Sequence, residues 1–409
     1  MKKNPTKSVY LLVCFLFAVL TTAVTADAEK ENNGEENKKS AAKETTPPSI
    51  KLASEKLSVK IGGRVLGDWM WGSAEDSTEA EFGPLVSGNE WRAAWLEVSG
   101  NYDGKIDFRV WYDFASGEAK AKDVWLGFKG LPFGSLKVGH FKEPFSLEQL
   151  MSLKVLTFME RSLANMFVPS RNTGIGVFGS EGMITWGAGV FTDADSQANA
   201  KAHDDTYNAT ARVTVTPYKE GSTVFHLGAA FHLRSVKDGG KIRFRERPEA
   251  HLAYRMVDTG SFAADSVNMF GLEGLVMMDR FSIQSEYIFT NVDAPDLDDP
   301  SFNGFYVYGS YFLTDDKRGY KASSSTPGGV KPKNPFYVEN GTGAWEVAAR
   351  YSQLDLDDDL IEGGTLKDIT VGINWYLNNY SRFMWNYIYA DRDDIGTANI
   401  FQMRYQFSF

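Results

Sequence analysis

The chain has a single cysteine and lacks a long apolar segment, and each absence excludes a class of protein. The cysteine, Cys14, lies near the N-terminus, so the remainder of the chain has no disulfide and no thiol chemistry. The apolar run from Val9 to Leu20 is shorter than the ~18 residues that a membrane-spanning helix needs, and no later run reaches that length. Helical membrane spans are therefore excluded.

The N-terminal residues have the three-part layout of a cleaved secretory signal. Three lysines precede the apolar run, and small residues follow it as far as Ala28. Residues 29–52 are charged, lack aromatic residues and contain Pro47-Pro48, which predicts a flexible periplasmic tail. We therefore expect a signal peptide at 1–28, this tail at 29–52 and a folded domain at 53–409.

Acidic residues outnumber basic ones, and the formal net charge is −10. A chain of this charge is a poor ligand for nucleic acid, so any anion that it handles must be held by local basic clusters. Aromatic residues reach 14% although the mean hydropathy is slightly polar at −0.30. This pairing is typical of an outer-membrane β-barrel, whose strands alternate apolar and polar residues between aromatic belts. A large soluble β-protein could have the same composition.

Short alternating segments separated by Gly, Asn, Asp and Pro follow one another from Leu57 onward. In the last of them, Phe401, Tyr405 and Phe409 fall on one face and polar residues on the other. A terminal strand that ends on Phe409 resembles the one that the outer-membrane barrel-insertion machinery recognises. The pattern predicts an all-β fold, a transmembrane antiparallel barrel.

The number of strands follows from parity, because a single-chain barrel of this class has an even number of strands. We count 17 alternating segments from the sequence, if the one at 241–255 is included. The short turns, such as Asp103-Gly104 and Asn378-Asn379, alternate correctly only if 236–263 is one long extracellular loop. The prediction is then 16 strands, with 241–255 inside a loop.

Two further connections are long, at 144–172 and at 314–341. By the same parity the first is extracellular and the second periplasmic. Loops of this length are usually functional, and in a barrel wide enough for a channel they can fold into the lumen and narrow it. We expect these two connections and the 236–263 loop to form the filter.

Four cations recur at every second position within that loop, at Lys241, Arg243, Arg245 and Arg247. In extended backbone such residues point the same way at a spacing of ~6.6 Å, so they form a row on one face. Arginine matches the oxygens of phosphate with its planar fork, and several sites of moderate strength allow conduction. The alternative is a solvated basic stripe that meets lipopolysaccharide outside the cell.

A second basic cluster lies in the long periplasmic connection. Lysines are compact, strongly hydrated charges that suit the collection or release of anions better than tight binding. The alternative is an ordinary solvated surface. The members are Lys317, Arg318, Lys321, Lys331 and Lys333.

Several motifs together resemble the phosphate-selective porins O and P, over roughly Leu57 to Phe409. The resemblance implies a trimeric barrel of 16 strands with inward-folded loops, an arginine ladder that descends to a constriction and a lysine cluster toward the periplasm. By this resemblance Arg243 and Arg245 are ladder arginines with Arg247 as a third, and Lys321 and Lys331 belong to the lysine cluster. The extra arginines of the best-known members are not matched, which puts strict phosphate selectivity in doubt. The motifs are Gly139 to Glu148, Thr157 to Leu163, Arg243 to Leu252, Val330 to Phe336 and Gly343 to Tyr351.

The expected function is a passive, anion-selective channel in the outer membrane for phosphate, pyrophosphate or polyphosphate, assembled as a homotrimer among lipid and lipopolysaccharide. Its expected anion path consists of Lys241, Arg243, Arg245, Arg247, Lys321 and Lys331. No cofactor, metal or catalytic group is expected, since the five histidines form no recognisable nucleophile or metal motif. The alternatives are a general or sugar-conducting porin, an outer-membrane enzyme and an adhesin.

Overall fold

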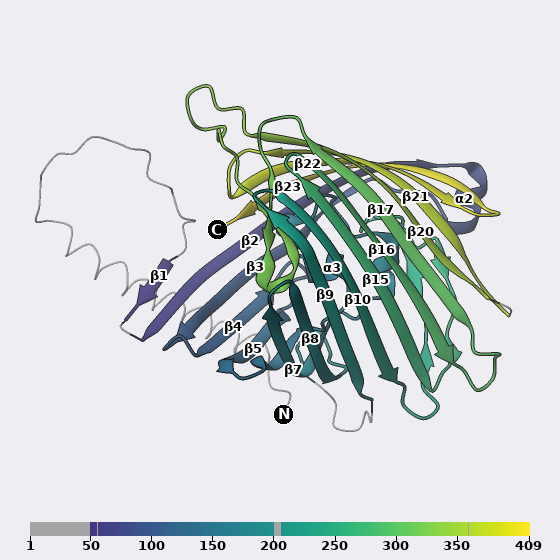
Figure 1. Ribbon diagram of the computed structural model, residues 1–409. Helices are drawn as coiled ribbons and strands as arrows, with labels where there is room; N and C mark the ends of the chain where they lie inside the picture. Colours follow the sequence, from purple (N-terminus) through teal and green to yellow (C-terminus); the bar gives the residue numbers. More distant parts are fainter. Residues whose placement is uncertain (1–49, 55, 200–205, 359) are drawn as a thin grey trace, which may run out of the picture. The chain divides into compact units, whose positions relative to one another are not determined.

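The chain forms a closed antiparallel β-barrel in a computed structural model that describes residues 50–54, 56–199, 206–358 and 360–409. The signal peptide expected at 1–28 and most of the tail expected at 29–52 lie outside these residues. In the described part of the chain, 16 strands form the wall, and β23 pairs with β2 to close it (Figure 1). The wall strands are β2 (Leu57–Ala74), β3 (Gly88–Tyr102), β4 (Ile106–Asp113), β5 (Lys120–Leu131), β6 (Gly134–Lys142), β7 (Arg171–Glu181), β8 (Ile184–Thr192), β9 (Asn208–Glu220), β10 (Thr223–Ser235), β15 (Ser266–Met278), β16 (Phe281–Asp293), β17 (Ser301–Phe312), β20 (Ala344–Asp358), β21 (Ile361–Tyr376), β22 (Ser381–Arg392) and β23 (Gly396–Ser408).

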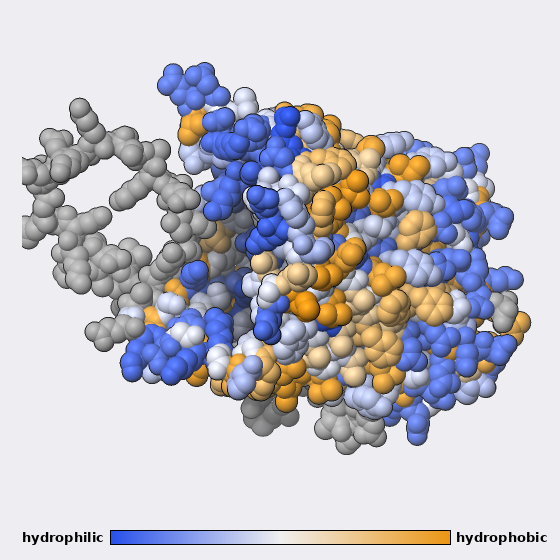
Figure 2. All heavy atoms as spheres, viewed as in Figure 1, coloured by the Kyte–Doolittle hydropathy of each residue, from blue (hydrophilic) through white to orange (hydrophobic). Residues whose placement is uncertain are grey.

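Side chains alternate between the lumen and the outer surface along the wall strands, as the sequence pattern predicts. At the C-terminal strand, Phe401 and Phe407 are exposed outside, whereas Gln402 and Arg404 are buried inside. Figure 2 shows apolar side chains in a band across the visible outer face, with hydrophilic residues at both ends. Such a band is the surface that the hydrocarbon of a membrane covers. No helix among the described residues is long and apolar enough to span a membrane.

The turns confirm the parity argument. Short connections follow β3, β5, β7, β9, β15 and β21, at the positions expected from the sequence. Leu57 and Phe409 lie at this same end, because Leu57 pairs with Tyr102 beside the first turn and Phe409 bonds to Gly63. This end is therefore the periplasmic one. The short strand β1 (Ile50–Ala53) adds to β2 there and begins slightly before the domain boundary expected at residue 53.

The segment 241–255 lies in a loop between β10 and β15, so its exclusion from the wall is confirmed. Two short hairpin-like ladders give this loop its shape. In the first, β11 (Lys241–Ile242) pairs with β14 (Phe262–Ala263). In the second, β12 (Arg245–Glu246) pairs with β13 (Val257–Asp258).

The long connections fold into the lumen, as their length predicts. The connection after β6 carries α3 (Leu147–Leu150), η1 (Leu153–Val155) and η2 (Leu163–Met166), and Figure 1 shows α3 surrounded by wall strands. Phe145, Leu147 and Met159 of this loop have no exposed surface. The periplasmic connection after β17 also turns inward as β18 (Arg318–Lys321), η3 (Ala322–Ser324) and β19 (Thr326–Val330). A further short helix, α2 (Asp76–Phe82), lies between β2 and β3.

Candidate functional site

Arginines of the wall and of β18 hold the backbone of the 144–172 loop inside the lumen. Arg350 of β20 donates to the carbonyl of Glu160 at 3.2 Å, and Arg382 of β22 donates to that of Leu156 at 2.7 Å. Arg404 reaches the carbonyl of Met159 and Arg318 that of Val155. Because charged donors make the stronger hydrogen bonds, these contacts fix the path of the loop.

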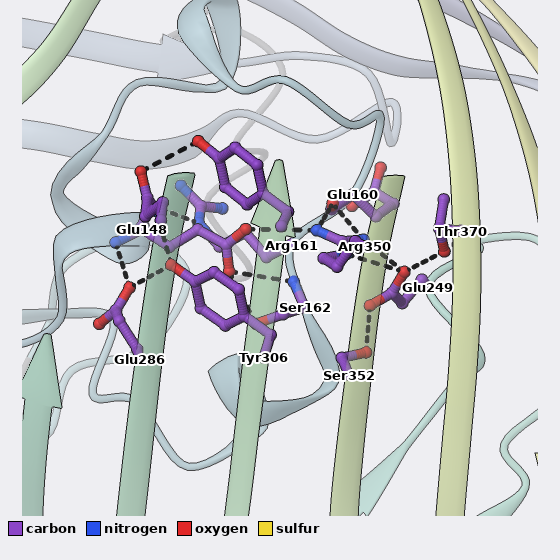
Figure 3. Close-up of polar contacts among 12 residues, drawn as sticks. Glu148, Glu160, Arg161, Ser162, Glu249, Glu286, Tyr306, Arg350, Ser352 and Thr370 are labelled. Carbon is purple, nitrogen blue, oxygen red and sulfur yellow. Dashed lines mark hydrogen bonds and ion pairs between the residues drawn. The ribbon is translucent and has the colours of Figure 1, made fainter. Parts of the chain in front are cut away.

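Three of these arginines are also neutralised by buried carboxylates. Arg404 bonds to Asp68 and to Glu160, each at 2.6 Å. Arg318 pairs with Glu346 at 2.8 Å, and Arg350 lies between Glu249 and Glu148 (Figure 3). The arginine side chains in these pairs are only 1–2% exposed. A buried pair of this kind has a structural role, because the charge of the arginine is already compensated by the carboxylate.

Glu249 fastens the second inward loop to the same wall. It has a left-handed backbone, with φ at 40°, which turns the chain so that its carboxylate points at β20 and β21. Ser352 donates to this carboxylate at 2.5 Å, and Thr370 and Arg350 donate to it as well (Figure 3). The loop between β10 and β15, expected from the sequence at 236–263, therefore has a fixed position next to the 144–172 loop.

A cavity of about 190 Å³ lies where the two loops meet. It contains both signs of charge, because Arg92 binds Glu160 through two bonds of 2.9 Å. Although burial opposes ionisation, Arg92 and Arg404 hold the pKa of Glu160 well below its usual range. Burial lowers the pKa of Arg161 to about 10, while Glu148 and Glu160 favour its charged form. The cavity is lined by Arg92, Glu160, Arg161, Glu246, Arg247 and Glu249, among others.

The expected cation row is present in part. Lys241, Arg243 and Arg245 are exposed, while Ile242 and Phe244 between them are buried, so the expected alternation of faces is confirmed. The ring of Phe244 packs 5.5 Å from that of Phe167 and 5.6 Å from that of Phe302, measured between centroids.

Two members of the row differ from the simple picture. Arg243 is neutralised by an ion pair with Asp258. Arg247 is half-buried, donates to the carbonyl of Ala253 at 2.7 Å and lines the cavity instead of continuing the exposed face. That these residues line an anion path stays a prediction.

Besides the paired arginines and the exposed row, the lumen holds a further group of cations that the sequence analysis did not single out. Its first members are Arg64 and Lys142, and neither forms an ion pair with a carboxylate among the described residues. Arg64 of β2 is 6% exposed and its guanidinium lies 4.3 Å from the ring centroid of Trp95. It donates to Ser152 at 3.3 Å, but its Nε and Nη1 have no hydrogen-bond partner in the described part of the chain. Lys142 donates to the carbonyl of Met151 at 3.0 Å.

Lys154 continues this group toward the periplasm. Its side chain has exposed surface, yet partial burial together with Arg64 and Lys321 lowers the pKa of Lys154 to about 8. Arg161 binds the same Met151 carbonyl as Lys142, at 3.1 Å. The cations Arg161, Lys142, Arg64 and Lys154 therefore follow residues 149–154 of the loop, and we call them the loop cations.

The periplasmic connection brings Lys321 into this group. The carbonyl of Ser325 accepts from Arg212 at 3.3 Å, and Tyr320 bonds to His226 at 2.8 Å, so the β18–β19 hairpin is held against β9 and β10. Lys321 follows directly and lies within electrostatic reach of Lys154. Lys331 is exposed just after β19. The other three members of the expected lysine cluster lie in ion pairs. Lys317 and Lys333 pair with acidic surface residues, and Arg318 pairs with the buried Glu346.

The sequence profile of the family named phosphate-selective porin O and P matches residues 70–409. The chain belongs to this family. The resemblance noted in the sequence is thereby confirmed, and the protein is a porin of the outer membrane. A curated relative named Porin O, from Pseudomonas aeruginosa, is 26% identical over 86% of this chain and 86% of its own length.

Solved porins share the barrel fold at low sequence identity. An anion-selective porin from Comamonas acidovorans superimposes with a TM-score of 0.55 at 14% identity, covering 87% of this chain and 100% of the other. OmpT, an outer membrane protein of Vibrio cholerae, does so with a TM-score of 0.57 at 12% identity, covering 88% and 99%. These likenesses establish the architecture and not the solute.

Proposed function

We propose that this porin is a passive, anion-selective channel whose solutes are phosphate, pyrophosphate or polyphosphate. The observation that carries the proposal is the set of loop cations. Arg64 and Lys154 lie along the 144–172 loop, and neither forms an ion pair with a carboxylate in the described residues. A desolvated cation without an ion-pair partner is costly, and we propose that anions in the lumen stabilise this group.

The proposed route has three stages. Lys241, Arg243 and Arg245 collect anions on the exposed face of the extracellular loop. Arg247 joins Arg92 and Arg161 at the cavity between the two loops, which we propose as the constriction. The loop cations then conduct the anion to Lys321 and Lys331, from which it leaves. Several sites of moderate affinity meet the requirement that an ion bind well enough to enter and weakly enough to leave.

Other observations support the choice of anions over sugars. A sugar path needs accessible aromatic faces, whereas Trp95 and Trp111 are only 9% and 6% exposed and lie against Arg64. The family is named for phosphate selectivity, and the similar porin from Comamonas acidovorans is described as anion-selective. No catalytic step and no energy source form part of the proposal.

We extend the proposal to assembly. A solved form of the Vibrio cholerae protein is described as a trimer, and we propose a homotrimer for this chain in the outer membrane, among lipid and lipopolysaccharide. Phe409 follows the last strand β23 directly, and we propose that the barrel-insertion machinery recognises this end of the chain before the barrel closes. Deletion of Phe409 should therefore slow insertion.

Conductance in planar bilayers tests the proposed function. Purified protein is measured under a potassium chloride gradient, and phosphate is then titrated while the chloride current is recorded. We expect a reversal potential on the anion-selective side and a block of the chloride current at submillimolar phosphate. Cation selectivity would refute the anion channel, whereas anion selectivity without a phosphate block would leave a general anion channel.

A further inference from the structure

The outer wall has a hollow of about 570 Å³ that is unrelated to the lumen. It lies over β17, β20, β21 and β22, and its outward-facing side chains are apolar or aromatic. Its volume falls within the ~300–1,000 Å³ that is typical of small-molecule sites. A concave site of this kind on a membrane-facing wall differs from the convex surface that strands normally present.

The hollow results from small residues in neighbouring strands. Gly309 of β17 lies directly opposite Ala349 of β20, and Ala349 lies opposite Val371 of β21. Larger side chains stand around them, with Tyr311 at one end and Tyr387 at the other. The floor is therefore low and the rim is high.

The depth of the hollow in the membrane follows from the strand positions. Phe281, which lines it, is the first residue of β16 after a periplasmic turn, and Tyr311 is the last but one of β17. Trp385, which also lines it, lies in the first half of β22, close to the periplasmic turn that precedes this strand. The hollow thus begins at the periplasmic end, and it faces the leaflet on that side of the membrane.

A cation stands at its periplasmic rim. Arg280 occupies the turn before Phe281, and its guanidinium lies 5.2 Å from the ring centroid of Tyr311. Arg280 forms no ion pair with a described residue, although Asp315 is within electrostatic reach. A planar guanidinium held against an aromatic ring presents its donors to a phosphate, which it can bind through two hydrogen bonds.

We propose that this hollow is a phospholipid site, in which one acyl chain lies over Gly309 and Ala349 and the phosphate of the headgroup binds Arg280. An apolar hollow that ends in a cation is complementary to a molecule with an apolar tail and an anionic head. A second barrel would present the convex outer face of its strands, which fits a concave floor poorly. A flexible methylene chain can follow such a surface and gain van der Waals contacts along it, as packing rather than exclusion of water favours association within a bilayer.

Native mass spectrometry tests the site with dioleoyl phosphatidylethanolamine added to the delipidated full-length barrel in detergent. Gly309→Leu should fill the hollow, and the fold tolerates it because an added Cβ would meet only the carbonyl oxygen of Ser282, at 4.0 Å. Gly274→Leu is the matched control, since this outward glycine of β15 lies outside the hollow and its added Cβ would meet only Leu227, at 3.8 Å. Arg280→Ala removes the headgroup contact, and Lys219→Ala removes an exposed lysine near another periplasmic turn.

We expect one retained lipid per barrel in the wild type and in both control variants. Gly309→Leu should lose this lipid. Arg280→Ala should bind it at least about tenfold more weakly, because the charge-assisted hydrogen bonds to the phosphate are lost. Equal lipid retention by Gly309→Leu and Gly274→Leu overturns the proposal. A second outcome also overturns it. If Gly309→Leu changes the oligomeric state and retains the lipid as the wild type does, the hollow is an interface between copies of the chain. Neither outcome depends on the solute of the channel.

Discussion

Two sets of basic side chains share the lumen and differ in what neutralises them. Arg212, Arg318, Arg350 and Arg404 each have a buried carboxylate partner, in pairs such as Arg212 and Glu273 at 2.5 Å. We call them the paired arginines. The loop cations form no ion pair with a carboxylate among the described residues. Arg64 bonds to a hydroxyl and lies against Trp95, whereas Lys142 and Arg161 bond to the carbonyl of Met151. From this difference we infer that the paired arginines have a structural role, and the conducting role belongs to the proposal for the loop cations.

The difference has an energetic basis. A buried ion pair contributes little net stability, but removal of one partner leaves an uncompensated charge and is strongly destabilising. A cation without a partner carries its desolvation cost in the folded state already, so its removal costs the fold little. The paired arginines are therefore expected to control stability, and the loop cations to control selectivity.

The largest expected effect is on a paired arginine. Arg350→Met would leave Glu249 and Glu148 buried without their cation, at a cost of about 3–5 kcal/mol in the free energy of unfolding. Urea unfolding of the wild type and the variant measures this cost. The double variant Arg350→Met with Glu249→Gln should recover part of it. An Arg350→Met barrel as stable as the wild type would contradict the structural role.

The next effect concerns affinity and not stability. Arg64→Gln should weaken the phosphate block of the chloride current about tenfold, because a charge-assisted hydrogen bond to the anion is lost. Its unfolding free energy should stay within about 1 kcal/mol of the wild type. Lys317→Gln is the control, since this lysine pairs with Asp279 on the surface. An unchanged phosphate block in Arg64→Gln would remove Arg64 from the path.

A pH dependence of intermediate size follows from Lys154. Since its pKa is lowered to about 8, the side chain is positive below that pH and loses its charge above it. The permeability ratio of chloride to potassium should therefore fall between pH 7 and pH 9. Reversal potentials in potassium chloride measure this ratio, and chloride itself does not change its charge over this pH range, as phosphate would. Lys154→Gln should abolish the step, and a step that persists in this variant would assign it to another group.

The smallest expected effect is on the exposed row. Arg243 is already neutralised by Asp258, and Arg245 is exposed, so neither is strongly desolvated. The double variant Arg243→Gln with Arg245→Gln should weaken the phosphate block by only about twofold, in keeping with the small energies of exposed charge interactions. A loss of phosphate block as large as that in Arg64→Gln would show that the exposed row contributes as much as the loop cations. No change at all would remove both arginines from the path.

Much of the fold could be predicted from the sequence because alternation and short turns are local signals. The polar and aromatic faces of the last strand and the short turns follow from neighbouring residues, and the exclusion of 241–255 from the wall follows from the parity of all the turns together. The inward course of the long loops was predicted from their length alone. The family motifs, whose match is confirmed, came from the resemblance.

The loop cations could not be predicted in the same way. Arg64 is one inward residue of a strand, and its role depends on Trp95 and Ser152, which come from other parts of the chain. Arg247 was expected to continue the exposed row, but Pro248 and the left-handed Glu249 turn the chain at that point. Alternation indicates which way a side chain points, whereas its charge balance depends on tertiary neighbours.

One measurement compares the two sets of cations directly, in a single molecule. Crystals of the protein soaked in bromide would locate anions by their anomalous scattering. We expect peaks beside Arg64, Lys154 and Lys321, and none within the ion pairs of Arg212, Arg350 and Arg404. Bromide at the paired arginines, with none beside the loop cations, would contradict the account.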